Sequence, residues 1–346
     1  MYKVGINQAQ EGMKLAADVV SDYGVILIPE GAVLTERTIR CLRNWDVNMV
    51  YIAEEQENVV RDRRKWHEQV KKHYRQTTER VMDLMEGLKG AQFLEVEEVR
   101  EVAEELVKYA NDVYSVKLLT EVKDKDYYTY QHSINVGIYT SLLGRWLGYE
   151  KSNMENLSLA GLLHDIGKTQ IPEAILNKPG PLSRKEFAVM KRHPLYSYEL
   201  LKHQQEIPQE VKLAVLQHHE RINGNGYPFG LKGNKIQRLS QVVSVVDIFD
   251  AITSTRVYKE RECPFAAVEE LRRKCFEDLD PEIAYTFFER ITEFFVGSTV
   301  IFDDGTQGEI IFLNRHDPTR PLVKVEDRFL DLAQNPDKEI VDVLVF

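Results

Sequence analysis

The sequence predicts a mainly α-helical protein with a small α/β unit at its N-terminal end and a small β-rich unit at its C-terminal end. Two observations support this fold class. Helical patterns dominate residues 54–294, and short apolar runs bounded by glycine or proline occur on either side. We therefore divide the chain into residues 1–53, 54–115, 116–294 and 295–346. The second segment is expected to be a helical connector and the third to be the main domain.

The N-terminal segment combines strand and helix signals. Residues 24–29 form a short apolar run between breakers, which predicts a strand. Thr35 is expected to cap a helix that extends to about Trp45, because Glu36 places an acid in the first turn. Residues 47–52 would then form a closing strand.

The connector is rich in Glu, Lys and Arg and contains no proline, and it predicts two helices at about 57–88 and 94–114. The second helix has one apolar face, formed by Val96, Val99, Ala103, Leu106, Val107 and Ala110. We prefer the interpretation in which this face packs on the main domain. The alternative is a signalling helix or a homodimer seam along residues 57–114.

Two loops interrupt the helical pattern of the main domain, at residues 177–182 and 222–236. The first contains two prolines and cannot be helical throughout, because proline removes a donor and restricts the residue before it. Ser183 followed by Glu186 is the signature of a capping box, so a helix is expected to restart there.

The C-terminal segment has strand signals. The apolar runs at 298–302 and 308–312 flank Asp304-Gly305, which predicts a hairpin, and residues 322–325 continue the pattern. We therefore expect a small β-rich unit here.

The composition is that of a globular protein and excludes some functions. The 346 residues are 43% hydrophobic and 29% charged, so the chain can bury a large core. A net charge of −10 argues against a general surface for nucleic-acid polymers, although it is compatible with a local basic pocket. The three cysteines lack CxxC spacing, which predicts reduced thiols and a cytoplasmic protein. We expect neither a signal peptide nor a membrane span, since no apolar run approaches roughly 18 residues.

Five of the nine histidines fall into one run with two aspartates. The run consists of His132, His164, Asp165, His193, His218, His219 and Asp247. A lone histidine such as His193 is more often a surface or core residue than a ligand. Imidazole and carboxylate are nevertheless common metal ligands, and one ion rarely needs more than about four of them. The run therefore predicts two metals, an arrangement suited to hydrolysing phosphate esters with water.

The neighbours of these residues indicate how they could share a site. His164 and Asp165 end an apolar helical stretch, and successive helical residues point about 100° apart, so the pair can hold adjoining points of one cluster. Asp165 is our candidate for a bridging ligand. His218 and His219 follow an apolar segment, where burying two imidazoles without partners would be costly. Asp247 lies in another apolar run and would close the site.

Four segments of the main domain form a larger pattern: HDIGK at 164–168, HHE at 218–220, NGNGYPFGLKG at 223–233 and DIFDAITSTRVY at 247–258. In order and spacing they resemble the HD-GYP branch of the HD-domain phosphohydrolases. The resemblance runs from about Tyr127 to Glu270. It implies a helical HD-type bundle for residues 116–294, and hydrolysis of cyclic di-GMP to pGpG and onward to GMP with iron or manganese.

The resemblance also implies roles for single residues. Its ligand sets would be His132, His164, Asp165 and Asp247 for one metal, and Asp165, His193, His218 and His219 for the other. Lys168 would contact a substrate phosphate or assist proton transfer, and Arg256 and Lys259 would hold phosphate oxygens. Tyr227 would line the substrate pocket, either stacking on a guanine or donating its hydroxyl. Without the resemblance, both lysines could be solvated surface charges, and Arg256 could pair with Asp250.

The sequence departs from the family pattern at two positions. Some members carry a glutamate four residues before the first histidine, where it supports a third metal. Tyr128 occupies that position here, and a phenol is a poor ligand, so we predict two metals. Asn223 stands where many members have an aspartate, which removes a charge near the pocket.

The expected reaction is attack on a phosphodiester phosphorus by a hydroxide that bridges the two metals. Asp165 and Lys168 are therefore the candidate catalytic residues. Two alternatives stay open: a hydrolase of another cyclic dinucleotide or nucleotide, because metal ligands contact the phosphate and not the base, and a non-catalytic cyclic-dinucleotide sensor. The complete ligand set favours an enzyme over a sensor.

Overall fold

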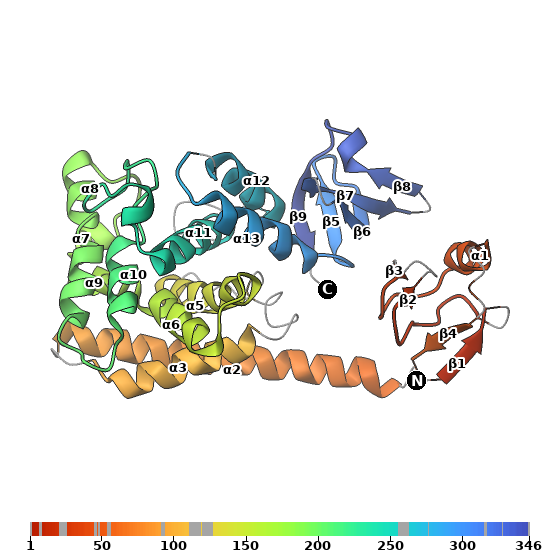
Figure 1. Cartoon of the computed structure of the whole chain (residues 1–346), viewed down its shortest axis with the longest axis horizontal. Coiled ribbons are helices and arrows are strands. Elements are labelled where there is room, and N and C mark those ends of the chain that lie inside the picture. Colours follow the sequence, from red (N-terminus) through yellow and green to blue (C-terminus); the bar gives the residue numbers. More distant parts are fainter. Residues whose placement is uncertain are drawn as a thin grey trace. The chain divides into compact units, whose positions relative to one another are not determined.

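The computed structural model describes residues 2–6, 9–20, 26–44, 47, 49–53, 57–90, 94–110, 119, 127–254, 263–275, 277–314, 317–326 and 328–344. The chain divides into two compact units, the N-terminal unit (Met1–Val70) and the main unit (Lys71–Phe346). The boundary lies within the long helix α2 (Glu57–Gly90). Figure 1 shows helices along most of the chain and strands at both ends, which confirms the predicted fold class.

The N-terminal unit contains two small antiparallel sheets and one helix. Its elements are β1 (Tyr2–Gly5) paired with β4 (Met49–Ile52), β2 (Val19–Val20) paired with β3 (Ile26–Ile28), and α1 (Glu36–Asn44). Thr35 precedes α1, and its Oγ1 accepts a hydrogen bond from the Thr38 amide at 3.1 Å, which confirms the predicted start of this helix. Leu15, Leu34 and Leu42 form part of its buried core.

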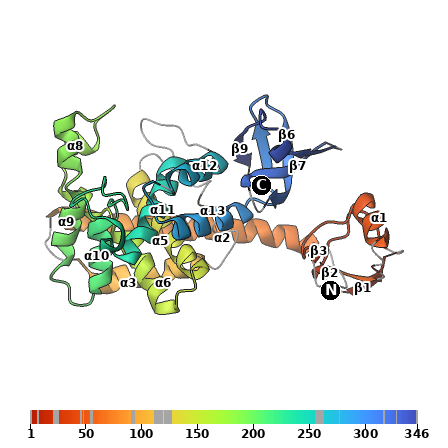
Figure 2. The ribbon, with the colours of Figure 1, turned by 45° about the horizontal axis from the view of Figure 1, so that its top comes forward.

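The main unit begins with a helical bundle. Its helices are α3 (Val96–Tyr109), α5 (Tyr128–Trp146), α6 (Lys151–Leu163), α7 (Glu173–Leu176), α8 (Arg184–Met190), α9 (His193–Leu201), α10 (Gln209–Gln217), α11 (Arg238–Thr253), α12 (Pro264–Lys274) and α13 (Pro281–Glu293), with 3₁₀ turns η1 (Ile166–Gln170) and η2 (Gly233–Lys235). Helices α5, α6 and α11 lie together in both views of the ribbon (Figure 2).

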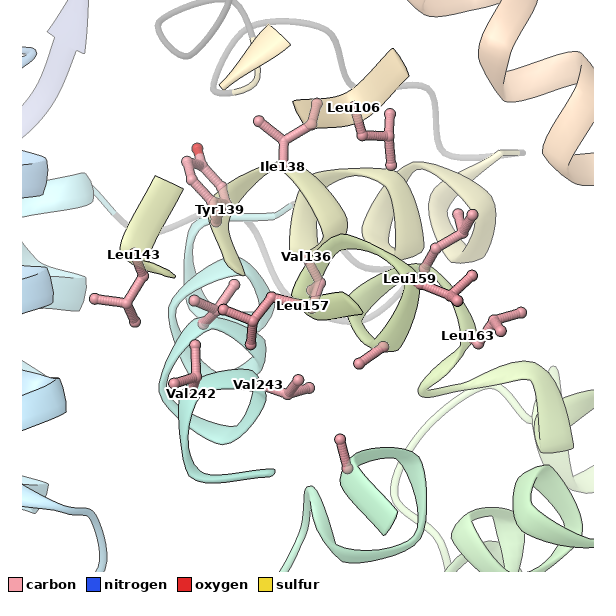
Figure 3. Close-up of a cluster of buried hydrophobic side chains, with 14 of the residues drawn as sticks. Leu106, Val136, Ile138, Tyr139, Leu143, Leu157, Leu159, Leu163, Val242 and Val243 are labelled. Carbon is pink, nitrogen blue, oxygen red and sulfur yellow. The ribbon is translucent and has the colours of Figure 1, made fainter. Parts of the chain in front are cut away.

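The core of the bundle lies between α3, α5, α6 and α11. Figure 3 shows Leu106 of α3, Ile138 of α5, Leu157 of α6 and Val242 of α11 around this core, and all four side chains are fully buried. Helix α5 is buried from Gln131 to Gly144, including its polar positions. Polar side chains on such a helix need partners inside the protein, because burying an unpaired polar group is costly.

The connector packs on the bundle. Tyr74, Val81 and Met85 of α2 and the apolar residues of α3 belong to the same hydrophobic core as α5 and α6. Helix α3 ends at Tyr109, short of the predicted end at residue 114, and residues 111–118 lie outside the described part of the chain. The apolar face of α3 thus packs within the bundle, as in the preferred interpretation. A homodimer through residues 57–114 stays a prediction.

The C-terminal residues form a five-stranded antiparallel sheet in the order β8-β7-β6-β5-β9. Its elements are β5 (Thr299–Phe302), β6 (Gln307–Asn314), β7 (Asp317–Val325), β8 (Arg328–Asp331) and β9 (Ile340–Leu344), with a 3₁₀ turn η3 (Leu332–Gln334). The predicted hairpin corresponds to β5 and β6. Buried side chains of the sheet pack with Phe265 at the start of α12 and with Phe295. None of the described helices has the length and apolar character that a membrane crossing requires.

Candidate metal centre

The seven predicted ligands come from five neighbouring parts of the bundle. His132 lies on α5, His164 and Asp165 follow α6, His193 begins α9, His218 and His219 follow α10, and Asp247 lies on α11. The structure brings them together in two groups, Asp165 with His193, His218 and His219, and His132 with His164 and Asp247. Within each group the candidate ligand atoms all lie within 4.8 Å of one another.

Asp165 lies at the junction of the two groups. Its Oδ1 is 3.2 Å from His193 Nε2 and 4.0 Å from His218 Nε2. Its Oδ2 is 3.3 Å from His164 Nε2 and 3.6 Å from His132 Nε2. Each oxygen of one carboxylate therefore faces a different group, which is the position that a ligand bridging two cations would need.

A close approach between η1 and α9 sets the place of Asp165. A Cβ atom added at Gly167 would lie 2.2 Å from the His193 carbonyl oxygen and 2.4 Å from the Ser197 amide nitrogen, so no larger residue fits without a shift of the backbone. The Gly167 amide donates to Ser197 Oγ at 2.8 Å, and Ser197 Oγ donates to the His164 carbonyl at 3.0 Å. Glycine at this position therefore lets the Asp165 and His193 side chains meet.

Backbone carbonyls orient three of the imidazoles. Nδ1 of His164, His193 and His218 lies 2.7, 2.9 and 2.7 Å from the carbonyl oxygen three residues earlier. A carbonyl only accepts, so Nδ1 carries the proton in each ring, and Nε2 presents a lone pair to the centre. This is the orientation that a metal-binding imidazole usually has.

The centre has the donor set of a cation site. Nε2 of His164 is 3.2 Å from Nε2 of His132, and Nε2 of His193 is 3.3 Å from Nε2 of His218. Lone pairs that face each other at this distance repel unless a proton or a cation lies between them. Asp165 Oδ1 is also buried and accepts no hydrogen bond from the described residues. Neutral imidazoles and carboxylates of this kind fit two divalent cations.

The electrostatics of the centre favour the metal-binding forms of His218 and Asp165. Burial, together with the nearby imidazole of His164, holds the pKa of His218 well below its ordinary value, which keeps that ring neutral. Burial alone would raise the pKa of Asp165. The Lys168 ammonium is the largest influence against this effect, and the pKa lies well below its usual range. Asp165 is therefore ionised.

Lys168 is the cation beside the centre. Its Nζ pairs with Asp165 Oδ2, and its side chain is partly exposed. The ammonium is thus more exposed than the buried carboxylate that it pairs with. Arg256 and Lys259, the other two predicted phosphate contacts, lie outside the described residues.

The loop after α10 holds Tyr227 against the centre. The ring centroid of Tyr227 lies 4.6 Å from that of His219, with the rings inclined by 34°. A Cβ atom at Gly226 would lie 2.5 Å from the Glu220 Cα atom, so only glycine lets the chain turn back on itself here. Buried Glu220 accepts hydrogen bonds from the Phe229 and Leu231 amides, at 2.7 and 2.8 Å.

Three contacts of the centre involve Asp250, Asn135 and Tyr128, which are not among the predicted metal ligands. Asp250 Oδ2 lies 2.7 Å from His132 Nδ1, and Asp250 Oδ1 accepts a hydrogen bond from Asn135 Nδ2 at 2.9 Å. Burial would lower the pKa of His132, but its hydrogen bonds to Asp247 and Asp250 raise it to about 9. The ring of Tyr128 stacks on His132, at a centroid distance of 5.9 Å. The signal for Asp250 and Asn135 was their spacing, three residues after Asp247 and His132 on the same helix faces.

A family model for the HD domain matches residues 118–283. With the His164-Asp165 pair at the junction of the centre and the Gly226-Tyr227-Pro228 loop beside it, this match decides the family. The chain contains an HD domain of the HD-GYP family.

Two curated relatives are similar to this chain in sequence. The chain is 36% identical over 229 residues to the cyclic di-GMP phosphodiesterase PA4108 of Pseudomonas aeruginosa, a match that covers 66% of this chain and 54% of the relative. It is 31% identical over 198 residues to the 3'3'-cGAMP-specific phosphodiesterase 2 of Vibrio cholerae, covering 57% of this chain and 36% of the relative. The chain thus spans about half or less of the length of these relatives.

One solved structure shares the fold over most of the chain. The structure of Bd1817, an HDG"Y"P protein from Bdellovibrio bacteriovorus, aligns with a TM-score of 0.52 and covers 83% of this chain and 98% of that one. The sequence identity is 18%, so the similarity concerns the fold alone.

Proposed function

We propose that the HD-GYP domain hydrolyses a phosphodiester bond of cyclic di-GMP, giving pGpG and then GMP, with the help of two divalent cations. The observation that carries this proposal is the position of Asp165 between two groups of histidine and aspartate ligands. The names of the relatives supply the substrate class, since both act on cyclic dinucleotides.

The chain's own residues have distinct tasks in this proposal. His132, His164, Asp165 and Asp247 would hold one cation, and Asp165, His193, His218 and His219 the other. Two such cations, when bound, lower the pKa of a water molecule and neutralise charge on phosphate oxygens, and both iron and manganese suit these ligands. The buried groups of the protein fix the positions of the ligands before the substrate arrives, so little reorganisation is required.

Three cationic side chains and one aromatic ring would act on the substrate. Lys168 would contact a phosphate oxygen, and its pairing with Asp165 and its partly exposed side chain support this role. Arg256 and Lys259 would hold further phosphate oxygens. Tyr227 would offer its ring to a guanine next to the cleaved phosphate, because it lies against His219 at the edge of the centre.

A second substrate is favoured by a specific observation. One relative acts on 3'3'-cGAMP, and the groups that bind metal contact the shared phosphate and not the bases. A cyclic-dinucleotide sensor that does not turn over its ligand would use the same pocket.

The test is anaerobic reconstitution of the full chain with Mn²⁺ or Fe²⁺, followed by metal analysis and turnover of cyclic di-GMP, 3'3'-cGAMP and cyclic di-AMP. We expect close to two metal ions per chain and fastest turnover of cyclic di-GMP. Faster turnover of 3'3'-cGAMP than of cyclic di-GMP would identify 3'3'-cGAMP as the preferred substrate. Tight binding of one of the three nucleotides without turnover would show that the protein is a sensor and not an enzyme.

Replacing the junction residue is the sharpest mutational test. Asp165→Ala removes a carboxylate shared by both ligand groups, so we expect loss of metal loading and a fall in turnover of at least about 10³-fold. Asp83→Ala is the matched control, because Asp83 is an exposed acid on α2. Full activity of the Asp165 variant would contradict the scheme.

A further inference from the structure

A line of buried hydrogen bonds leads from helix α2 to the metal ligand His132. Tyr74 Oη on α2 donates to Asn135 Oδ1 on α5 at 2.7 Å. Asn135 Nδ2 donates to Asp250 Oδ1 on α11 at 2.9 Å, and Asp250 Oδ2 lies 2.7 Å from His132 Nδ1. All four side chains are at most 3% exposed, so no solvent competes with these contacts.

The Tyr74 hydroxyl determines the donor and the acceptor in each hydrogen bond between Tyr74 and His132. Burial, reinforced by the charge of Asp250, holds the pKa of the Tyr74 phenol well above its ordinary value, so the hydroxyl keeps its proton. A phenol that donates to Asn135 must face the amide oxygen, and the amide NH₂ group then faces Asp250. The Asp250 carboxylate accepts from both sides, so His132 Nδ1 carries the hydrogen in that contact.

These hydrogen bonds determine which ring nitrogen of His132 faces the metal centre. With Nδ1 held by Asp250, Nε2 is the nitrogen of His132 that faces the centre, where it lies 3.2 Å from Asp247 Oδ1 and would bind a cation in place of its proton. The spacing of the residues supports this arrangement, because His132 and Asn135 share one face of α5, and Asp247 and Asp250 share one face of α11. Each helix thus supplies one metal ligand and one residue that supports it.

Without the Tyr74 hydroxyl, neither orientation of the Asn135 amide satisfies all of these buried polar groups. The Asn135 amide could keep its orientation, and its buried oxygen would then lose its donor. It could also rotate, but its oxygen would then face the Asp250 carboxylate, and the two groups would repel. Either outcome loosens the contact between Asp250 and the ring of His132.

We propose that Tyr74 is a positioning residue of the metal centre, whose hydroxyl sets the Asn135 amide and, through Asp250, the tautomer and orientation of His132. The inference rests on the part of the proposed function in which these ligands bind metal. It adds a helix outside the ligand set, α2, to the groups that determine metal affinity. A phenylalanine at this position would fill the same space in the core, so the role belongs to the hydroxyl.

The test compares Tyr74→Phe with the wild-type full chain for Mn²⁺ affinity, measured by competition with a chelator and without substrate. Loss of a group that supports a ligand typically weakens metal binding by about 10–100-fold, and for this more distant hydroxyl we expect roughly 3–10-fold. At saturating Mn²⁺ the KM for cyclic di-GMP should stay unchanged, because Tyr74 is not part of the substrate pocket.

Tyr130→Phe is the matched control. Tyr130 also joins α5 to α2 through its hydroxyl, which donates to Glu86 Oε1 at 2.5 Å, but this bond does not lead to a metal ligand. We expect Mn²⁺ affinity within about twofold of wild type in this variant, and circular dichroism and thermal melting show whether either variant is folded. An equal loss in both variants would assign the effect to helix docking and overturn the proposal.

A double variant tests whether Tyr74 affects Mn²⁺ affinity through Asp250. Asp250→Asn replaces the carboxylate with an amide and should weaken Mn²⁺ binding by roughly 10–100-fold. In that background, Tyr74→Phe is expected to add less than about a twofold further loss, since coupled positions are not additive. Wild-type affinity in the single Tyr74 variant, or full additivity in the double variant, would overturn the inference. Failure of the wild type to hydrolyse any cyclic dinucleotide would overturn the proposed function instead and leave this inference standing.

Discussion

Glu220 shows at the scale of one residue how the fold positions the loop beside the metal centre. Its carboxylate is buried, and the amides of Phe229 and Leu231 donate to its two oxygens. Charge-assisted hydrogen bonds of this kind compensate for the lost hydration of a carboxylate. Because the loop between Glu220 and Leu231 contains Tyr227, the same carboxylate determines where that ring lies.

We therefore predict that Glu220→Ala weakens substrate binding more than metal binding. The variant leaves two loop amides without an acceptor, and we expect it to lower the free energy of unfolding by about 1–3 kcal/mol. The KM for cyclic di-GMP should rise while the metal content stays at the wild-type level, because the seven ligands are unchanged. Glu206→Ala, which removes an exposed glutamate, is the control. A lost metal content with an unchanged KM would contradict this role of the loop.

The metal ligands could be predicted from the sequence because histidines and aspartates within apolar helical runs are unusual. The supporting residues could be predicted only in part. Asp250 and Asn135 follow ligands by one helical turn, which is a usable signal, but Tyr74 has no local signature. Its contact with Asn135 joins residues 61 apart in the chain, and only the packing of α2 on α5 creates it. Arg256 and Lys259 keep the roles that the family resemblance implies, as predictions.

At the scale of elements, local sequence signals were most reliable where a cap or a strong period exists. The capping box at the start of α8 is confirmed, since the Glu186 amide donates to Ser183 Oγ and the Ser183 amide donates to the Glu186 carboxylate. Short elements such as η1 and β8 were not predicted, because four or five residues are too few to show a period. Tertiary contacts determine those elements.

The capping box gives a prediction for α8 alone. None of the helix's residues is buried, so its order depends on local interactions. Ser183→Ala should cost α8 about 1 kcal/mol of local stability, or roughly fivefold faster amide hydrogen exchange across residues 184–190. Ser152→Ala, an exposed serine in the first turn of α6 that is not a cap, should leave exchange in α6 nearly unchanged. Faster exchange throughout the bundle would show that Ser183 has a global role instead.

At the scale of the whole molecule, the sequence could not indicate how the parts of the chain divide. The boundary between the two compact units lies within α2, between Val70 and Lys71, and residues 57–86 contain no glycine or proline to mark it. The division into segments that end at residues 53, 115 and 294 therefore stays a prediction. The centre, in contrast, depends on several helices of the main unit at once. Its ligands lie on or next to α5, α6, α9, α10 and α11.

This convergence predicts that bound metal stabilises the main unit. Ligands that bind only the folded state raise its stability, by about 2.7 kcal/mol when the free ligand is at 100 times its Kd. In a protein of this size that corresponds to an increase in Tm of roughly 5–10 °C. The stabilisation should come from joining helices that are far apart in sequence, because the ligands extend from His132 to Asp247.

We therefore expect chelation to lower the Tm of the Mn²⁺-loaded wild type by roughly 5–10 °C, measured by calorimetry, and re-addition of Mn²⁺ to restore it. Asp165→Ala should show almost no change on chelation, since both ligand groups lose their shared carboxylate. Asp83→Ala should respond like the wild type. The same chelation shift in the Asp165 variant would mean that the stabilising metal binds elsewhere, and a wild type that is insensitive to chelation would remove the link between this centre and the stability of the bundle.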